Sequence, residues 1–353
     1  MRKIPVKKKY EQGKVSDLSK FIEELLKKYE VIAPVQRERK MLQFEKIESK
    51  DDIDFENFPH AQLSFKQWLL PKDQLLLKYS IDKSKLVIDD KMESVPKRVI
   101  FGLHACDIHS LKILDSVFLE EDDLDTAYKH MRDNTLIIGV GCKSSFKNCF
   151  CGSMNTATPP DDVYDLFIYL DGDKFYVSVG TDRDSLSKKL KSKSSSDADK
   201  KVSELINNYS SNQKLQMPKA DLQKLVADSY GAEFWTELGS KCFGCGGCTV
   251  SCPTCFCFVT DDVAEGKGKQ KMFRRIRNLD SCTLTNWALA AGGHNFQRTR
   301  GERLHRRFMH KFSQMKEKYG TIACIGCGRC VAICPTGAGN PVTVFSDLIK
   351  SNS

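Results

Sequence analysis

Apolar residues in the first 180 positions follow two spacings, one helical and one extended. Asp17 to Tyr29 carries apolar side chains at intervals of three and four residues, which predicts an amphipathic helix. Short apolar runs predict strands at 31–35, 98–104, 135–141, 163–170 and 174–179. Asp171-Gly172-Asp173 lies between the last two runs and indicates a hairpin. Because helical segments separate the other strands, we expect residues 1–180 to form an α/β domain.

The pattern changes after residue 180. Residues 181–201 are polar and rich in Ser and Lys, which is typical of an exposed loop or linker. Helical spacing returns at 220–238, around 283–291 and at 302–318. No alternating strand pattern follows Cys257, so residues 202–353 are expected to form a second, mostly α-helical domain.

Cysteine usage distinguishes this chain from an ordinary protein of 353 residues. Four of its fifteen cysteines lie between Cys106 and Cys151, and eleven lie between Cys242 and Cys334. Residues 1–14 are charged and lack the apolar core of a secretory leader, and no run approaches the roughly 18 apolar residues of a membrane span. We therefore expect a cytoplasmic chain whose thiols bind metal. The net charge of +9 is spread over Lys/Glu mixtures, so no nucleic-acid partner is expected.

Two cysteine runs share the pattern C-x2-C-x2-C-x3-C-P. The first contains Cys242, Cys245, Cys248 and Cys252, and the second contains Cys324, Cys327, Cys330 and Cys334. Two-residue gaps let a curled backbone direct three thiolates at one cluster, and the intervening glycines let amide groups approach it. Each complete run with its Cys-Pro ending predicts a [4Fe–4S] cluster. Structural zinc is the alternative, but it needs only four thiolates, usually in two separated pairs.

The fourth cysteine of each run is expected to bind the other cluster, as in two-cluster ferredoxins. This rule assigns one cluster to Cys242, Cys245, Cys248 and Cys334, and the other to Cys324, Cys327, Cys330 and Cys252. The 71 residues 253–323 between the runs are too many for a compact bacterial ferredoxin. The predicted fold class is therefore α+β, with an N-terminal α/β domain followed by a mostly α-helical dicluster ferredoxin domain. Thiolate ligation leaves no open iron, so we expect both clusters to transfer single electrons.

The remaining cysteines form two groups. Four of them follow predicted strands and predict a third [4Fe–4S] cluster, with core packing as the alternative: Cys106, Cys142, Cys149 and Cys151. Cys255, Cys257 and Cys282 are expected to pack near a cluster rather than to bind a further metal. His104 and His109 flank Cys106 and are expected to support it rather than to bind metal.

Other motifs are scarce. The basic stretch 291–312 is expected to be a solvated helix face that also offsets cluster charge, although it could dock an acidic partner or a phosphate. No G-x-G-x-x-G after a strand, Walker A run or Ser-His-Asp set is present. No nucleotide, flavin or catalytic residues are therefore predicted.

Five segments in a fixed order resemble a known family. The chain is similar to the iron–sulfur β subunit of soluble sulfhydrogenases, and equally to the iron–sulfur electron-transfer subunit of anaerobic sulfite reductase. The similarity lies in GLHACDIHSLKILD, CFCGSM, CGGCTVSCPTCFCF, AGGHNFQRTRGERLHRRFMHKF and CIGCGRCVAICP, between about residues 98 and 337. The first ninety residues carry no matching motif.

The resemblance implies an electron-relay subunit of a cytoplasmic redox complex. Its partners would be a flavoprotein that exchanges hydride with NAD(P)H and a catalytic subunit of the hydrogenase, sulfite reductase or heterodisulfide-reductase-like type. Two alternatives stay open. One is a reductase with its own substrate site at an N-terminal cluster, and the other is a zinc-dependent nucleic-acid-binding protein.

Overall fold

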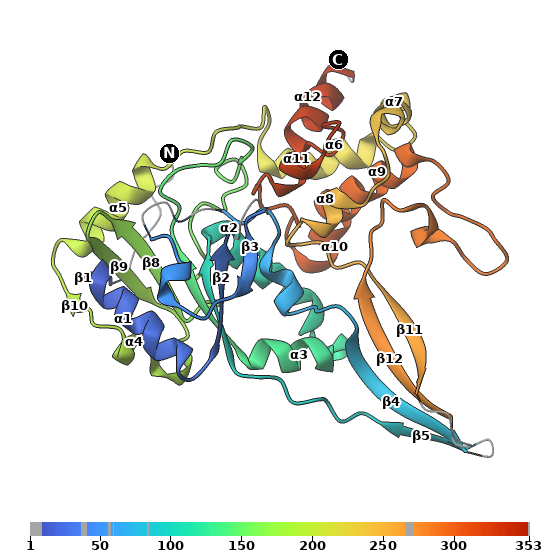
Figure 1. Ribbon diagram of the computed structural model, residues 1–353. Helices are drawn as coiled ribbons and strands as arrows, with labels where there is room; N and C mark the ends of the chain where they lie inside the picture. Colours follow the sequence, from blue (N-terminus) through green and yellow to red (C-terminus); the bar gives the residue numbers. More distant parts are fainter. Residues whose placement is uncertain are drawn as a thin grey trace.

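The chain contains both helices and strands, as the sequence predicts. The computed structural model describes residues 9–36, 41–55, 58, 60–82, 85–265 and 271–351. Residues 1–8, which belong to the charged N-terminal stretch, lie outside this part. An eight-stranded sheet occupies one end of the molecule, and the C-terminal helices occupy the other (Figure 1). A four-stranded sheet projects from the region where the two meet.

The larger sheet has the strand order β10-β1-β9-β8-β7-β6-β2-β3. Its strands are β1 (Glu11–Lys14), β2 (Glu30–Val35), β3 (Gln43–Lys46), β6 (Arg98–Leu103), β7 (Thr135–Val140), β8 (Leu166–Asp171), β9 (Lys174–Val179) and β10 (Lys193–Ser194). The adjacent strands β2, β6, β7 and β8 run parallel, and the flanking pairs are antiparallel. The central parallel strands are almost wholly buried, which explains why they read as continuous apolar runs.

Helices pack on both faces of the larger sheet. They are α1 (Val15–Leu26), α2 (Ala105–Phe118), α3 (Thr126–Asp133), α4 (Leu186–Lys189) and α5 (Ala198–Asn208). The apolar stripe of α1 packs with α4 on one face, whereas α2, α3 and α5 pack on the other. The polar segment 181–201 is part of this unit, because β10 pairs with β1 and Leu186 and Ala198 are buried.

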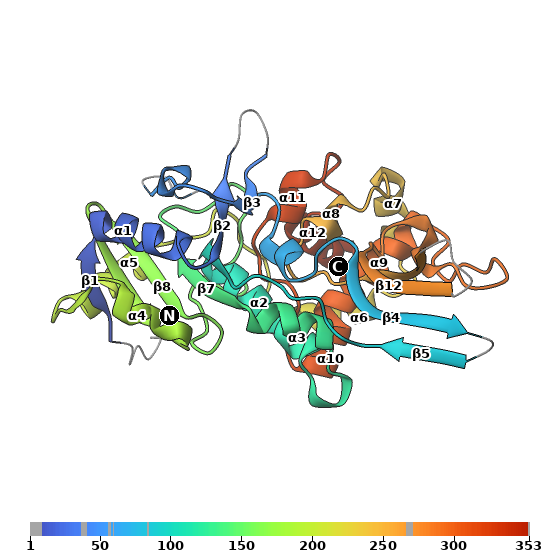
Figure 2. The same ribbon diagram turned by 60° about the horizontal axis from the view of Figure 1, so that its bottom comes forward.

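A second sheet joins residues from both halves of the sequence. Its order is β11-β12-β4-β5, with strands β4 (Gln74–Asp82), β5 (Lys85–Asp89), β11 (Phe258–Glu265) and β12 (Lys271–Leu279). The expectation of no strand after Cys257 was therefore wrong. Most residues of β5 and β11 are exposed, so their sequences lack the alternation of a half-buried strand. Strands β4 and β5 of this sheet extend away from the larger sheet (Figure 2).

The C-terminal helices surround the cysteine runs. They are α6 (Leu222–Asp228), α7 (Glu233–Lys241), α8 (Gly247–Val250), α9 (Arg300–Met309), α10 (Met315–Tyr319), α11 (Arg329–Ile333) and α12 (Pro341–Ser351). The single helix expected at 220–238 is two helices, because Gly231 adopts a φ of +77° between them. The helix expected at 302–318 forms as α9 and α10, joined by a π-helical turn at His310–Gln314. At 283–291 only a short 3-10 helix forms, Thr285–Ala288.

Candidate metal centres

The backbones of the two cysteine runs follow the same path. Gly244 in the first run and Gly326 in the second both have a φ of +67°. Gly246 and Gly328 have φ values of +77° and +75°, and each directly precedes a short helix, α8 or α11. A side chain would strain the backbone at these left-handed values, so glycine is required for the turn. Equal spacing therefore produces two equally curled loops.

Each predicted set of four cysteines lines a cavity of its own. The first cavity is lined by Cys242, Cys245, Cys248 and Cys334. The second is lined by Cys252, Cys324, Cys327 and Cys330. All eight thiols are free. The fourth cysteine of each run thus lies with the first three of the other run, which is the grouping that crossed ligation requires.

A buried arginine lies between these two cavities and fits the presence of anionic clusters. Arg307 is 2% exposed, and its charge faces sulfurs of both sets, including Cys248 and Cys330. Its Nη2 donates to the Cys248 carbonyl at 3.5 Å, but Nε and Nη1 have no hydrogen-bond partner among the described residues. A buried guanidinium is costly unless an anion compensates it. Thiolate-bound clusters, which carry sulfide acceptors and negative charge, meet that need.

Arg307 belongs to a row of buried cations that sequence analysis assigned to a solvated face. Arg303, Arg307 and Lys311 are spaced by four residues, so they lie on one side of α9 and the turn that follows it. Arg303 donates to three carbonyl oxygens of the loop 283–298, from Nε at 3.1 Å and from Nη1 at 2.9 and 3.0 Å. The outward residues Arg298 and Arg300 remain exposed. The spacing of four was the available signal that one side of this helix faces inward.

The four N-terminal cysteines come together at the ends of adjacent parallel strands. Cys106 lies in the first turn of α2 after β6, and Cys142 follows β7. The sulfurs of Cys149 and Cys151 are 3.2 Å apart, and the Tyr209 hydroxyl lies 3.6 and 3.2 Å from them. The hydrogen bond to Cys151 holds the pKa of Cys149 below its usual range. Cys142 interacts electrostatically with Cys149, and Cys106 interacts electrostatically with Cys151. The four thiols therefore form one group.

The loop that carries Cys149 and Cys151 is in backbone contact with the second cysteine run. Phe150 N donates to the Gly326 carbonyl at 2.8 Å, and Thr156 Oγ1 donates to the Ile325 carbonyl at 2.6 Å. A Cβ at Gly326 would lie only 2.8 Å from the Cα of Cys151. Glycine is therefore needed here for close approach as well as for its φ.

A buried ion pair also joins the two halves. Asp107 follows Cys106 in α2, and Arg329 follows Cys327 and Gly328 in the second run. The guanidinium contacts both carboxylate oxygens, at 2.6 and 3.1 Å, and the two side chains are 1% and 0% exposed. Cys327 interacts electrostatically with Cys106. The four N-terminal thiols therefore adjoin the cavity that contains Cys327.

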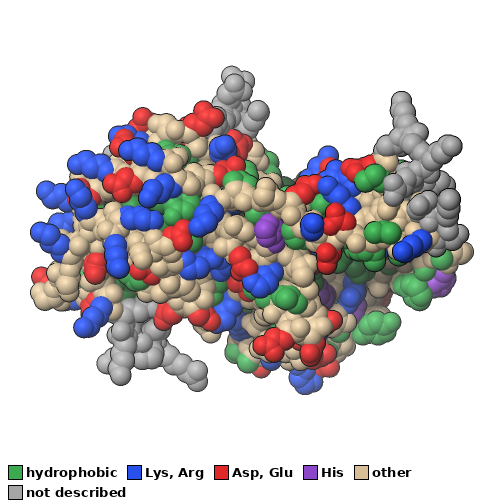
Figure 3. All heavy atoms as spheres, turned by 90° about the horizontal axis from the view of Figure 1, so that it is seen from below, with side chains coloured by type: hydrophobic (Ala, Val, Ile, Leu, Met, Phe, Trp, Pro, Cys, Tyr) green, Lys and Arg blue, Asp and Glu red, His purple; other side chains and the backbone are tan. Residues whose placement is uncertain are grey.

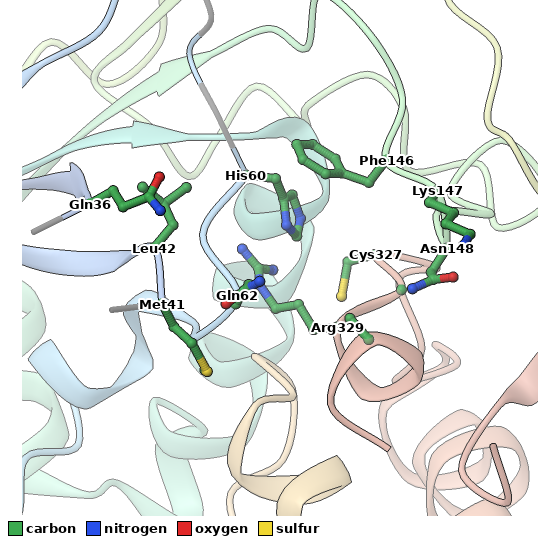
Figure 4. Close-up of a pocket in the computed structure, with 12 residues that line it drawn as sticks. Gln36, Met41, Leu42, His60, Gln62, Phe146, Lys147, Asn148, Cys327 and Arg329 are labelled. Atoms are coloured by element: carbon green, nitrogen blue, oxygen red, sulfur yellow. The ribbon is translucent and has the colours of Figure 1, made fainter. Parts of the chain in front are cut away.

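Histidines support this junction. His104 Nδ1 lies 2.8 Å from the Val140 carbonyl, and His109 Nε2 lies 2.8 Å from the Thr158 carbonyl. His60, which sequence analysis did not single out, stacks on His104 and lines a cavity of about 290 Å³ together with Cys327 and Arg329 (Figure 4). Burial keeps the pKa of His60 well below its usual range.

Sulfur spacing bears on the zinc alternative. Four sulfurs around one tetrahedral zinc ion lie about 3.8 Å apart, given Zn–S bonds of about 2.3 Å. Among the described residues, which include all fifteen cysteines, no three sulfurs lie within 4.8 Å of one another. The one such group of three potential ligands is His60, Cys106 and Asp107, and Asp107 is engaged by Arg329. Within the described part of the chain, no three thiols are therefore grouped as closely as one zinc ion requires.

The surface carries mixed charge. Lys and Arg side chains are intermingled with Asp and Glu over the face seen in Figure 3, as the sequence predicts for solvated helix faces. No helix within the described part of the chain has the length and apolar character needed to cross a membrane.

Comparisons with known proteins support a 4Fe-4S dicluster domain and indicate the family. Residues 241–338 match the family model described as a 4Fe-4S dicluster domain. The chain is 30% identical over 312 residues to "Sulfhydrogenase 2 subunit beta" of Pyrococcus furiosus, which covers 86% of this chain and 88% of that protein. No solved structure shows a significant match. With a dicluster domain at its C-terminal end and this similarity over most of its length, the chain belongs to the iron–sulfur β subunit family of sulfhydrogenases.

Proposed function

We propose that this chain is an electron-relay subunit that carries three [4Fe–4S] clusters and has no substrate site of its own. The first cluster would be held by Cys242, Cys245, Cys248 and Cys334. The second would be held by Cys252, Cys324, Cys327 and Cys330, and the third by Cys106, Cys142, Cys149 and Cys151. Thiolate-bound clusters of this kind exchange single electrons.

Continuity between the thiol groups is the observation that carries this proposal. Arg307 faces the first and second groups together, and Cys106 of the third group faces Cys327 of the second. The hydrogen bond between Phe150 and Gly326 and the Asp107–Arg329 ion pair keep the second and third groups in fixed contact. A fixed row of redox centres supports transfer through the chain rather than chemistry at one end of it.

The exposed surroundings of the first thiol group favour it as the place where electrons enter or leave this chain. Cys245 is the exposed one among the fifteen cysteines. Phe243, two residues before it in sequence, is 69% exposed, and Val250 and Leu284 nearby in the fold are also exposed. Large apolar side chains at an exposed redox site favour a surface that a partner covers.

The partners we propose are a flavoprotein that oxidises NAD(P)H and a catalytic subunit of the hydrogenase, sulfite reductase or heterodisulfide-reductase-like type. Flavins convert hydride pairs into single electrons, and no flavin or nucleotide motif was found in this sequence. The relative's name connects it with a sulfhydrogenase. The exposed Arg298 and Arg300 offer positive charge for an acidic partner surface, whose contribution would weaken with salt. We propose that this complex is cytoplasmic.

Replacing one ligand of the third cluster tests the relay. In Cys106→Ser, the electron paramagnetic resonance (EPR) signals of the first and second clusters should persist, while electron flow between flavoprotein and catalytic subunit falls at least tenfold. The experiment uses the full chain, because both halves of the sequence contribute to the junction. Wild-type electron flow through a chain that has lost the third cluster would exclude that cluster from the relay.

A second candidate function is a reductase with a substrate site at the third cluster. The observation in its favour is a cavity of about 300 Å³ lined by Cys142, Tyr169 and Tyr209. A third-cluster EPR signal that responds to a small oxidised substrate, together with turnover by the isolated chain, would establish this function.

A further inference from the structure

Three cysteines outside the three proposed clusters form a group of their own. Cys255 and Cys257 lie in the loop after the first run, and Cys282 lies 25 residues further along the chain. All three are free thiols, and Cys255 and Cys282 are buried. Packing near a cluster was the expectation from sequence, but their mutual arrangement points to more than packing.

The base of the β11–β12 hairpin brings Cys257 and Cys282 together. Strand β11 begins directly after Cys257, and its first residue pairs with Leu279, the last residue of β12. Asp280 N donates to the Cys257 carbonyl at 2.8 Å and extends this pairing by one step. The Cys282 side chain hydrogen-bonds to Cys257 and lowers the pKa of the Cys257 thiol to about 6. Cys255 acts electrostatically on Cys282, and its side chain hydrogen-bonds to Cys252, so the three-cysteine group adjoins the proposed second cluster.

Lys66 from the N-terminal half holds the loop that carries Cys255. Its Nζ donates to the carbonyls of Thr249, Cys252 and Cys255 at 3.0, 2.9 and 2.8 Å. The side chain is buried and belongs to a 3-10 helix, Phe65–Trp68, more than 180 residues away in sequence. One ammonium group thus binds three backbone carbonyls between Thr249 and Cys255.

Positive charge without a matching carboxylate surrounds the three sulfurs. Burial alone would lower the pKa of Lys311, but the thiolates of Cys252 and Cys255 raise it. Its Nζ donates to Thr254 Oγ1 at 2.7 Å and to the Ala323 carbonyl at 3.2 Å, both neutral acceptors. Arg307 also faces Cys255. These buried cations lie beside thiolates of the second cluster and of the three-cysteine group, and negative charge on either one offsets them.

We propose that Cys255, Cys257 and Cys282 bind an additional iron–sulfur cluster beside the second cluster, with Lys66 and Lys311 as its charge-compensating neighbours. Thiolates are the ligands that iron–sulfur clusters and zinc prefer. Three thiolates would leave one iron of a cubane without a cysteine ligand from this chain. This site is additional to the relay and does not depend on it.

Metal analysis of the full chain tests this proposal. Wild-type protein, reconstituted anaerobically, should contain four iron and four sulfide ions more per chain than the triple variant Cys255→Ala, Cys257→Ala, Cys282→Ala, if the extra core is a cubane. Ser281→Ala is the matched control, because it disturbs the same buried turn through its contacts with Thr249 and Thr283 but removes no thiol. The control should keep the wild-type iron and sulfide content.

A second variant keeps the test decisive if the triple variant does not fold. Cys282→Ser alone should change the EPR spectrum of the reduced chain while the signals of the other clusters persist. Unchanged iron, sulfide and EPR spectra in both sets of variants would overturn the proposal, and so would loss of zinc instead of iron. A chain with twelve irons that still relays electrons would refute this site and leave the proposed function intact.

Discussion

The two cysteine runs share one backbone path but occupy different surroundings. The first run lies near the surface, with Cys245 and Phe243 exposed. In the second run Cys327 and Cys330 are buried, and Arg329 is paired with Asp107 of the N-terminal half. Gly247 stands in the first run where Arg329 stands in the second. Spacing therefore determines how a run curls around a cluster, whereas the residue between the cysteines and the packing around it determine whether that cluster faces a partner or the interior.

Replacing the fourth cysteine of either run should have the largest effect on the cluster content. Cys252→Ser should remove about four irons and the EPR signal of the cluster that we assign to Cys324, Cys327 and Cys330. The matched variant Cys334→Ser should instead remove the cluster of the first run. If each variant destroyed the cluster of its own run, the crossed assignment would be wrong.

The buried Asp107–Arg329 ion pair should contribute strongly to the free energy of unfolding. Asp107→Asn leaves the Arg329 charge buried without its partner, and such changes cost about 3–5 kcal/mol. Anaerobic denaturant unfolding of the full chain measures the loss. Gly247→Ala, at the matching place in the first run, should cost far less, because the nearest side-chain atoms lie 3.6–3.7 Å from a Cβ there. An equal decrease in the free energy of unfolding for the two variants would show that this ion pair does not distinguish the second run from the first.

Arg307 should raise the reduction potentials of both clusters, because its positive charge stabilises the more negative reduced state. One charge about 8 Å away at an effective dielectric constant of about 20 contributes about 2 kcal/mol, or roughly 90 mV for one electron. Arg307→Gln should therefore lower both midpoint potentials in an EPR-monitored redox titration. The exposed Arg298→Gln should shift them only slightly, because water and salt screen its charge. A shift confined to one cluster would contradict the position between them.

A change in the exposed apolar surface of the first run should have the smallest effect, a moderate loss of affinity for a partner. Phe243→Ser should weaken binding of the partner that covers it by about tenfold, or about 1.4 kcal/mol, without changing the iron content. Calorimetric titration with each purified partner measures the change. Leu86→Ser on the projecting arm, also an exposed apolar position, is the control. Unchanged affinity for every partner after Phe243→Ser would exclude this surface as the docking site.

Sequence reasoning found the cluster motifs because their spacing is local. Gly244, Gly326 and the cysteines beside them act within a few residues of one another, so the printed order determines their geometry. The β11–β12 strands escaped notice because β12 pairs with β4, which lies almost 200 residues earlier, and because most of β11 is exposed. Lys66 and His60 carry no local motif, and only the folded chain brings them to the cysteines. Long-range contacts were thus the part that pattern analysis could not supply.

The central claim is that this chain relays electrons and does not itself react with NAD(P)H. The most direct measurement mixes the anaerobically purified, flavin-free chain with NADH or NADPH and an acceptor dye, first alone and then with its flavoprotein. The account predicts no turnover by the chain alone. After the flavoprotein is added, it predicts dye reduction and EPR signals of reduced clusters in this chain. Steady NAD(P)H oxidation by the isolated, flavin-free chain would contradict the relay and would place a nucleotide site in residues 1–180.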